Sequence, residues 1–402
     1  MDSSALIDIQ RWLVAQGLLG QMEIELLAGF CERCRAHGLL ISQAVLYIDT
    51  LHPVLESWGF FWDAEEGVEE SQQQFLRADA EENEQKWRRS PFFAMKEAGQ
   101  TELRVSLQGS EPLPFLVLGE LRDKGQTDYF AMIHRLCGTD TIGEMDNLYS
   151  RWSSTSPNGF SEDEIDTLRE LLPTLALSIK TAAVRRIAQA LVSVYLGRDP
   201  GRRVLEGRIA RGAVESIHTV LWFSDMTDYT SLSEQAGSSE LIGLLNDYSE
   251  AAIVSVTKNG GDVLKLIGDG TLAIFNAASP TAAAQNALAA RRELAERLRS
   301  LNRSRLENGQ VVTSIYLSLH VGEVFYGNIG SCDRLDFTVI GPAVNEVCRI
   351  ASTCKEIGRP LVISSAFRDL LPSEDQAKFF GAGSHRLKGV REPMDLYAEI
   401  EM

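Results

Sequence analysis

The sequence predicts an α+β chain in which two mixed domains are joined by a helical connector. Three patterns lead to this prediction: a split βαββαβ order late in the chain, short strand-like runs early in it, and a regularly spaced apolar helix between them. We place the segments at 1–39 (N-terminal helices), 40–180 (first mixed domain), 181–212 (connector) and 213–402 (second mixed domain).

The composition is that of a globular protein and excludes several classes of partner. With 402 residues, of which 44% are hydrophobic, the chain has material for two or three separate cores. The formal net charge of -17 disfavours nonspecific attraction to nucleic acid or to anionic lipid. We find no run of about 18 uncharged apolar residues and no basic leader, so neither a membrane span nor a signal peptide is expected. Because the six cysteines are scattered, we expect reduced thiols and a cytoplasmic location.

The first 160 residues predict two helices followed by a sheet. The helix-like runs are IDIQRWLVAQGL and EIELLAGFCERCRAHG. Strand-like runs follow, namely AVLYID, ESWGFFW, ELRVSL and FLVLGEL, and a polar helical stretch, SQQQFLRADAEENEQKW, lies among them.

The end of this region resembles a GAF domain. The residues that carry the resemblance are DYFAMIHRL and, after it, SRWSSTSPNGFSEDEIDTLRELLPTLALSIK, which are similar to the last strands and the final helix of that family. The resemblance implies a GAF-like sensor domain over residues 40–180, with a small-molecule or ion ligand of unknown identity.

Ser161 is predicted to begin the connecting helix with a capping box, because Glu164 follows three residues later and Phe160 precedes it. Apolar residues then recur at spacings of three and four: Ile165, Leu168, Leu172, Leu175, Ile179 and Ala182. This spacing is typical of a helix paired with a copy of itself, although a helix packed on its own domain would show nearly the same pattern. We favour the paired helix, with a joint at Pro200-Gly201.

The second domain alternates strand and helix patterns. In order, the runs are VLWFSD (strand), SSELIGLLNDYSEAAIVSVTKN (helix), GGDVLKLIGDGTLAIF (hairpin), TAAAQNALAARRELAERLRSLNRSR (helix), SIYLSLHVGEVFYGNIG and DFTVIG (strands) and AVNEVCRIASTCKEIG (helix). Together they predict the split βαββαβ arrangement.

Two aspartates give the clearest chemical signal. Asp225 ends a buried strand-like run, and Asp269 lies in a hairpin between Gly268 and Gly270, which permit a tight backbone. Either acid alone is more simply a helix cap or a turn residue. Together, at the ends of strands in one sheet, they can hold two divalent ions beside a triphosphate. Lys265 and Asp269 lie four residues apart in one strand pattern, which predicts the same face and a separation of about 13 Å.

Four segments in this order resemble the class III nucleotidyl cyclases: FSDMTDYTSLSE, KLIGDG, FTVIGPAVNEVCRIA and LKGVREPMDLY. The resemblance covers residues 213–402 and implies a ferredoxin-like βαββαβ cyclase domain. It implies that Asp225, Asp269 and the Met226 carbonyl bind two Mg²⁺ or Mn²⁺ ions per site.

The resemblance also implies roles for six further residues. Lys265 and Thr338 take the base-contact positions, Asn345 orients the ribose, and Arg349 stabilises charge on the α-phosphate. Lys388 and Arg334 are candidates for contact with the terminal phosphates.

The base-contact residues favour ATP as substrate. A lysine can donate to adenine N1 and a threonine hydroxyl can contact the exocyclic amine, whereas guanine requires an acceptor. We therefore expect an adenylate cyclase that forms 3',5'-cyclic AMP and pyrophosphate at homodimer interfaces, with two-metal catalysis and sensor control. The alternatives are a guanylate cyclase and a catalytically silent nucleotide-binding module. Asp228 and Tyr229 depart from the glycine and phenylalanine common in the family, and this adds a negative charge near the expected phosphate turn.

Overall fold

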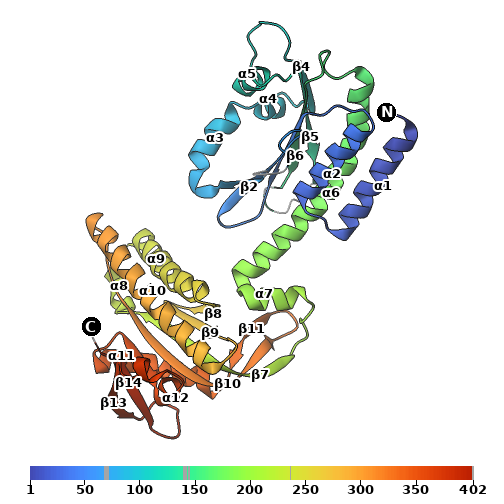
Figure 1. Cartoon of the computed structure of the whole chain (residues 1–402). Helices are drawn as coiled ribbons and strands as arrows, with labels where there is room; N and C mark the ends of the chain where they lie inside the picture. Colours follow the sequence, from blue (N-terminus) through green and yellow to red (C-terminus); the bar gives the residue numbers. More distant parts are fainter. Residues whose placement is uncertain (68–71, 139–142, 144, 236, 401–402) are drawn as a thin grey trace. The chain divides into compact units, whose positions relative to one another are not determined.

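The computed structural model describes residues 1–67, 72–138, 143, 145–235 and 237–400. The chain divides into two compact units, Met1–Leu191 and Val192–Met402, which we describe separately (Figure 1). Within the described ranges, no helix combines the length and the apolar character needed to cross a membrane.

The first unit is built on a six-stranded antiparallel sheet. Its strands are β1 (Gln43–Asp49), β2 (Leu55–Asp63), β3 (Gln72–Leu76), β4 (Glu102–Ser106), β5 (Asp128–Arg135) and β6 (Asn147–Ser154). Its helices are α1 (Ser3–Leu19), α2 (Glu23–Ala36), the 3-10 turn η1 (Arg77–Asp79), α3 (Ala80–Arg88), α4 (Pro91–Glu97), α5 (Leu116–Asp123) and α6 (Glu162–Leu196). The strand order is β3-β2-β1-β6-β5-β4. One face of the sheet packs against α1, α2 and α6, and the other against α3, α4 and α5 (Figure 1).

Two secondary-structure predictions in this unit are wrong. The run FLVLGEL forms α5 instead of a strand, because Leu118 and Leu121 share one helical face and are buried together. A short apolar run does not distinguish helix from strand by period alone. The polar stretch that was predicted to be wholly helical begins as the edge strand β3, which pairs with β2 before α3 starts.

The connecting helix begins as predicted but packs differently. In the capping box, Ser161 Oγ accepts from the Glu164 N–H at 3.3 Å and Glu164 Oε2 accepts from the Ser161 N–H at 2.7 Å. The six apolar residues of the regular stripe are all 6% exposed or less and belong to the core that α6 shares with α1, α2 and the sheet. The prediction of a helix paired through this stripe is therefore wrong. The predicted joint is also misplaced: α6 ends at Leu196, Gly197 has a φ of 92°, and Pro200-Gly201 lies inside the next helix.

We expect Leu172→Ala to lower the free energy of unfolding by about 2–5 kcal/mol, because Leu172 fills a closed core. Since the contacts lie within one chain, the loss should be the same at protein concentrations that differ tenfold. Denaturant titration at both concentrations measures this. The control is Leu177→Ala, which truncates a side chain that is 62% exposed on the same helix and should change stability little. If the loss of stability in Leu172→Ala depended on protein concentration, it would support a helix paired through this stripe.

The second unit is built on an eight-stranded sheet. Its strands are β7 (Val214–Met226), β8 (Gly261–Ile267), β9 (Gly270–Phe275), β10 (Ile315–Gly330), β11 (Leu335–Ile340), β12 (Leu361–Ser364), β13 (Phe379–His385) and β14 (Met394–Glu399). Its helices are α7 (Arg198–Leu205), α8 (Tyr229–Gln235), α9 (Ser238–Lys258), α10 (Pro280–Glu307), α11 (Pro342–Ile357), α12 (Ser365–Arg368) and α13 (Ser373–Gln376).

The centre of this sheet has the order β10-β7-β9-β8, with every neighbouring pair antiparallel. With α9 between β7 and β8, and α10 between β9 and β10, this is the predicted split βαββαβ arrangement. α9 and α10 pack on one face, and α11 packs on the other (Figure 1). β11 pairs with the end of β10, so the sheet holds the ends of β7, β8 and β11 in fixed register.

Candidate active site

The structure brings the two predicted acids together. Asp225 is near the end of β7, and Asp269 lies in the turn between β8 and β9. The Met226 N–H donates to Asp269 Oδ2 at 3.2 Å, and the two carboxyl groups are in hydrogen-bonding contact. Burial, together with the charge of Asp269, raises the pKa of Asp225 to about 6. Two carboxylates held this close in a partly buried place repel each other unless a cation or a proton lies between them.

The backbone around this acid pair is tight. A Cβ atom on Gly270 would come within 3.2 Å of Asp225 Oδ1 and 2.9 Å of the Phe223 ring, so a side chain there would displace the acid. Asp269 follows the end of β8 and is not on the strand, and the pairing of β8 with β9 shifts register between Val263 and Lys265. The prediction that Lys265 and Asp269 share one face of a regular strand is therefore wrong.

The donor set fits a divalent cation in part. Carboxylate and carbonyl oxygens are the ligands that Mg²⁺ prefers, and it usually keeps waters and substrate phosphates as its other ligands. Asp225 and Asp269 supply carboxylates beside the Met226 backbone. In the described part of the chain, no third acidic, histidine or cysteine side chain joins them to form a group of three. The pair therefore suits an ion that completes its coordination with a nucleotide.

The base-contact residues lie on β8 and β11, and an acid that the sequence analysis missed connects these two strands. Lys265 on β8 forms an ion pair and hydrogen bond with Asp336 on β11; the two side chains are 45% and 43% exposed. Thr338 lies two residues beyond Asp336 on the same strand, so it is on the same face. The spacing of two residues between Asp336 and Thr338 in DFTVIG could have indicated that both lie on one face of the strand. The Asp336 carboxylate is an acceptor beside the proposed base position, and it accepts a hydrogen bond from Lys265.

The remaining predicted residues are exposed on α11 or in turns. Asn345 and Arg349 lie one helical turn apart on α11. The pKa of Cys348, raised by burial, responds to the charges of both Arg349 and Asp225, which places α11 beside the acid pair. Arg334 lies in the turn between β10 and β11, and Lys388 lies between β13 and β14.

In the described residues, no hydrogen bond or ion pair connects the two acids with the predicted nucleotide-binding residues. Among the described residues, the side chains of Arg349, Asn345, Lys388 and Arg334 make no hydrogen bond or ion pair. In the same described ranges, no such contact joins the acid pair to Lys265 or Thr338. The structure therefore forms two groups, the acid pair and the base-contact strands, with α11 next to the first.

Asp228 occupies a strained backbone position next to the acid pair. Its φ is 53°, and among the described residues it is the only non-glycine residue with positive φ. Lys355 Nζ lies 2.7 Å from Asp228 Oδ1, and both side chains are exposed. The charge that was predicted to oppose phosphate binding is therefore balanced by a lysine of α11, another contact that the sequence analysis missed.

We expect Asp228→Gly to raise the free energy of unfolding by about 0.5–1 kcal/mol, because glycine adopts positive φ without strain. Loss of the exposed ion pair with Lys355 should offset little of this gain. The control Asp228→Asn removes the charge but keeps a Cβ atom at this φ, so it should not show the gain. Thermal and denaturant unfolding measure both variants. An equal gain in both would assign the effect to charge instead of backbone strain.

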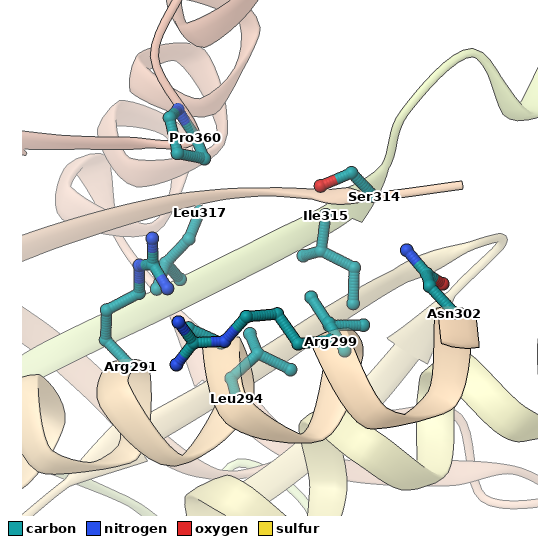
Figure 2. Close-up of a pocket in the computed structure, with 10 residues that line it drawn as sticks. Arg291, Leu294, Arg299, Asn302, Ser314, Ile315, Leu317 and Pro360 are labelled. Atoms are coloured by element: carbon teal, nitrogen blue, oxygen red, sulfur yellow. The ribbon is translucent and has the colours of Figure 1, made fainter. Parts of the chain in front are cut away.

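A groove between α10 and the start of β10 has a volume of about 210 Å³ (Figure 2). Its lining combines apolar side chains with two arginines, as Leu294, Ile315, Leu317, Arg291 and Arg299 show in the close-up. Arg291 pairs with Glu399 at 3.0 Å. The groove includes none of the predicted site residues, so it is separate from the acid pair and the base-contact strands.

Comparison with known proteins identifies relatives of the second unit. Residues 214–399 match a family described as "Adenylate and Guanylate cyclase catalytic domain". The chain is 25% identical over 228 residues to "Adenylate cyclase 1" of Rhizobium meliloti (strain 1021), covering 56% of this chain and 34% of that protein. It is 29% identical over 187 residues to "Adenylate cyclase" of Anabaena cylindrica, covering 46% of this chain and 37% of that protein. It thus spans about a third of the length of these curated relatives.

A solved structure is also similar. It is the crystal structure of the adenylyl cyclase CyaB from P. aeruginosa, with 22% sequence identity and a TM-score of 0.42. The match covers 47% of this chain and 96% of that one.

Proposed function

We propose that this chain, whose residues 214–399 form a class III nucleotidyl cyclase catalytic domain, is an adenylate cyclase that converts ATP to 3',5'-cyclic AMP and pyrophosphate. The observation that carries the proposal is the contact between Asp225, near the end of β7, and Asp269, in the turn between β8 and β9. Binding of a divalent cation relieves the repulsion between two carboxylates held together at the end of a sheet.

In this proposal, Asp225, Asp269 and the Met226 carbonyl hold Mg²⁺ or Mn²⁺. Such ions, when bound, lower the pKa of a coordinated hydroxyl and neutralise phosphate charge. The protein itself positions the nucleotide. Asn345 orients the ribose, and Arg349, exposed and without an ion-pair partner in the described ranges, offers a fork of donors to the α-phosphate. Lys388 and Arg334 are assigned to the terminal phosphates.

Selection of adenine is assigned to Lys265 and Thr338, with Asp336 as a positioning residue. The ion pair with Asp336 fixes the Lys265 ammonium and leaves its other N–H donors for adenine N1. It also occupies the carboxylate that guanine N1–H and the guanine amine would otherwise use. This engagement favours ATP over the guanylate cyclase alternative.

We assign each site to a homodimer interface, for two reasons. Phe325 and Ile340 are directly paired across β10 and β11 and are 49% and 45% exposed, on the same face as Thr338. Exposed apolar side chains beside a binding position favour cover by a second protein surface. In the described ranges, no hydrogen bond or ion pair joins the acids to the base-contact residues within one chain, as expected if they serve different sites of a symmetric dimer.

Mixing two inactive variants tests this assignment. Asp269→Asn removes an acid and Arg349→Ala removes the arginine, and each should be inactive alone. If one site takes its acid from one copy and its arginine from the other, a mixed dimer keeps one intact site. Random exchange should then recover about a quarter of wild-type activity. Recovery of none, with mixed dimers demonstrated by differential tagging, would contradict the composite site.

We infer that the first unit is a GAF-like sensor that controls the cyclase. A six-stranded antiparallel sheet with helices on both faces, followed by a long helix that leads into the second unit, supports this inference. All six cysteines are free, which agrees with a reducing cytoplasmic location. A chain that lacks the first unit should lose regulation, and unchanged activity and dimerisation would count against the inference.

One assay distinguishes the candidate functions. The full chain is incubated with ATP or with GTP, plus Mg²⁺ or Mn²⁺, and the cyclic product is identified by mass. Cyclic AMP from ATP supports the proposal, and cyclic GMP alone indicates the guanylate cyclase. Nucleotide binding without any product indicates the silent module.

A further inference from the structure

We propose that the first unit binds a small carboxylate on the α4 and α5 side of its sheet, anchored by Arg151 and Ser153 of β6. The observation is a pair of buried polar atoms with no partner. Arg151 Nη1 and Ser153 Oγ are both buried, and neither has a hydrogen bond. Ser153 is only 1% exposed. This inference goes beyond the proposed cyclase activity and does not depend on it.

The two atoms share one face of a central strand. Arg151 pairs with Val45 of β1 and with Ala131 of β5, in unbroken register on both sides. Side chains alternate along a strand, so Arg151 and Ser153 lie on the same face. Trp152, between them, packs into the core with α1, α2 and α6, and therefore Arg151 and Ser153 face the α4 and α5 side.

Arg151 differs from two other arginines of this unit, both of which pair with acids. Arg104 pairs with Asp128 at 2.9 Å, and Arg186 pairs with Glu23 at 2.8 Å. In the described part of the chain, Arg151 has neither a carboxylate partner nor an aromatic ring beneath it. The buried atom of Arg151 is Nη1, and a buried donor without an acceptor costs free energy. Among the described residues, no carboxylate pairs with Arg151, so an anion from outside can supply the counter-charge.

The surroundings identify the class of anion. Tyr47 and Tyr129 lie close enough to Arg151 for its charge to act on both phenols: burial raises their pKa, and the guanidinium opposes that rise. Phenols, a serine hydroxyl and a guanidinium are all donors that an oxyanion accepts from. Arg151 as a whole is only partly buried, so a ligand can reach it.

The wall beside this anchor is aromatic. Tyr149 lies two residues before Arg151 on the same face of β6, and its ring contacts Phe92 at 5.4 Å and Trp87 at 5.0 Å between centroids. Tyr47 contacts Phe92 at 6.1 Å. One guanidinium suits one negative charge, and aromatic rings suit an apolar body. The geometry therefore favours an organic carboxylate over a bare phosphate.

The test uses the full chain and benzoate as the probe, at constant ionic strength set with sodium chloride. Isothermal titration should show saturable binding, and the melting temperature should rise by several degrees at saturation, because the ligand binds the folded state only. Arg151→Met should weaken binding at least tenfold. Arg89→Met, which removes an exposed arginine from the same unit, should bind like the wild type.

The ligand-free variants separate binding from a structural role. If Arg151 serves a ligand, Arg151→Met without ligand should melt no lower than the wild type, because a buried donor without an acceptor has been removed. If Arg151 is structural, that variant should melt lower. Ser153→Ala should weaken binding several-fold. If Arg151→Met does not fold, Arg151→Lys can be used instead. It keeps the positive charge but lacks the paired N–H donors of the guanidinium, so it should bind benzoate more weakly than the wild type does.

Three outcomes would overturn the proposal. The first is that benzoate does not bind the wild type, and the second is that it binds Arg151→Met as tightly as the wild type. The third is that inorganic phosphate, but not benzoate, binds and raises the melting temperature, which would exclude the carboxylate class. None of these results involves nucleotide turnover. The carboxylate site and the cyclase activity can therefore fail independently of each other.

Discussion

Asp225→Asn should lower the rate of cyclic nucleotide formation by about a thousandfold, roughly 4 kcal/mol of transition-state stabilisation, because it removes a carboxylate that would hold the cation. The same substitution should make the protein more stable. Burial and the neighbouring charge of Asp269 raise the pKa of Asp225 to about 6, so its ionised form is unfavourable in the folded state without metal.

The gain in stability depends on pH in a defined way. The folded state of the wild type holds a proton on Asp225 that the unfolded chain releases near pH 4, so wild-type stability falls as the pH rises from about 4 to about 6. The advantage of Asp225→Asn should be absent below about pH 4 and complete above about pH 6. We expect about 1 kcal/mol after allowance for solvent screening of this partly exposed pair.

Thermal unfolding across this pH range, together with product assays, measures both effects. Asp369→Asn removes one exposed carboxylate from the same unit and should change neither activity nor stability appreciably. Added Mg²⁺ should stabilise the wild type more than Asp225→Asn. A variant that is inactive and also less stable at pH 7.5 would contradict the account, since it would mean that the acid pair supports the fold.

Asp336→Asn should reduce the preference for ATP over GTP by about tenfold, chiefly by raising the KM for ATP, because a charged hydrogen bond to Lys265 of about 1.5–3 kcal/mol is weakened. Lys265→Ala should have a larger effect. It removes the donor to adenine N1 and frees the Asp336 carboxylate to accept from guanine, so the preference should fall by about a hundredfold or reverse.

The double variant separates these contributions. In the double variant Lys265→Ala with Asp336→Ala, the increase in kcat/KM for GTP expected of Lys265→Ala alone should disappear, because the Asp336 carboxylate that would accept from guanine has been removed. Asp395→Asn, an exposed acid on β14, is the matched control and should keep the wild-type preference. Steady-state kinetics with both nucleotides give the ratios of kcat/KM. If Asp336→Asn leaves the ratio unchanged, Asp336 does not position Lys265 for base selection.

Much of the second unit was predictable because its signals are local. Long periodic runs predicted α9, α10, β10 and α11 close to their observed bounds, and the glycines beside Asp269 marked its turn. The run VLWFSD predicted only the second half of β7, which begins six residues earlier, at Val214. The first unit was less predictable where runs were short. FLVLGEL and SQQQFL have no decisive period, and contacts with the sheet determine that one is the helix α5 and the other begins the strand β3.

The sequence by itself determined the candidate site residues, because the identity and spacing of Asp225, Asp269, Lys265 and Thr338 are properties of the chain. Only the tertiary structure decided which side chains meet. It put Asp336 against Lys265, Lys355 against Asp228, and the apolar stripe of α6 into its own core instead of a partner helix. The physical reason is that a periodic pattern tells which face of an element is apolar or charged but not what that face contacts. The contact depends on strand register and on helix packing between residues far apart in the chain.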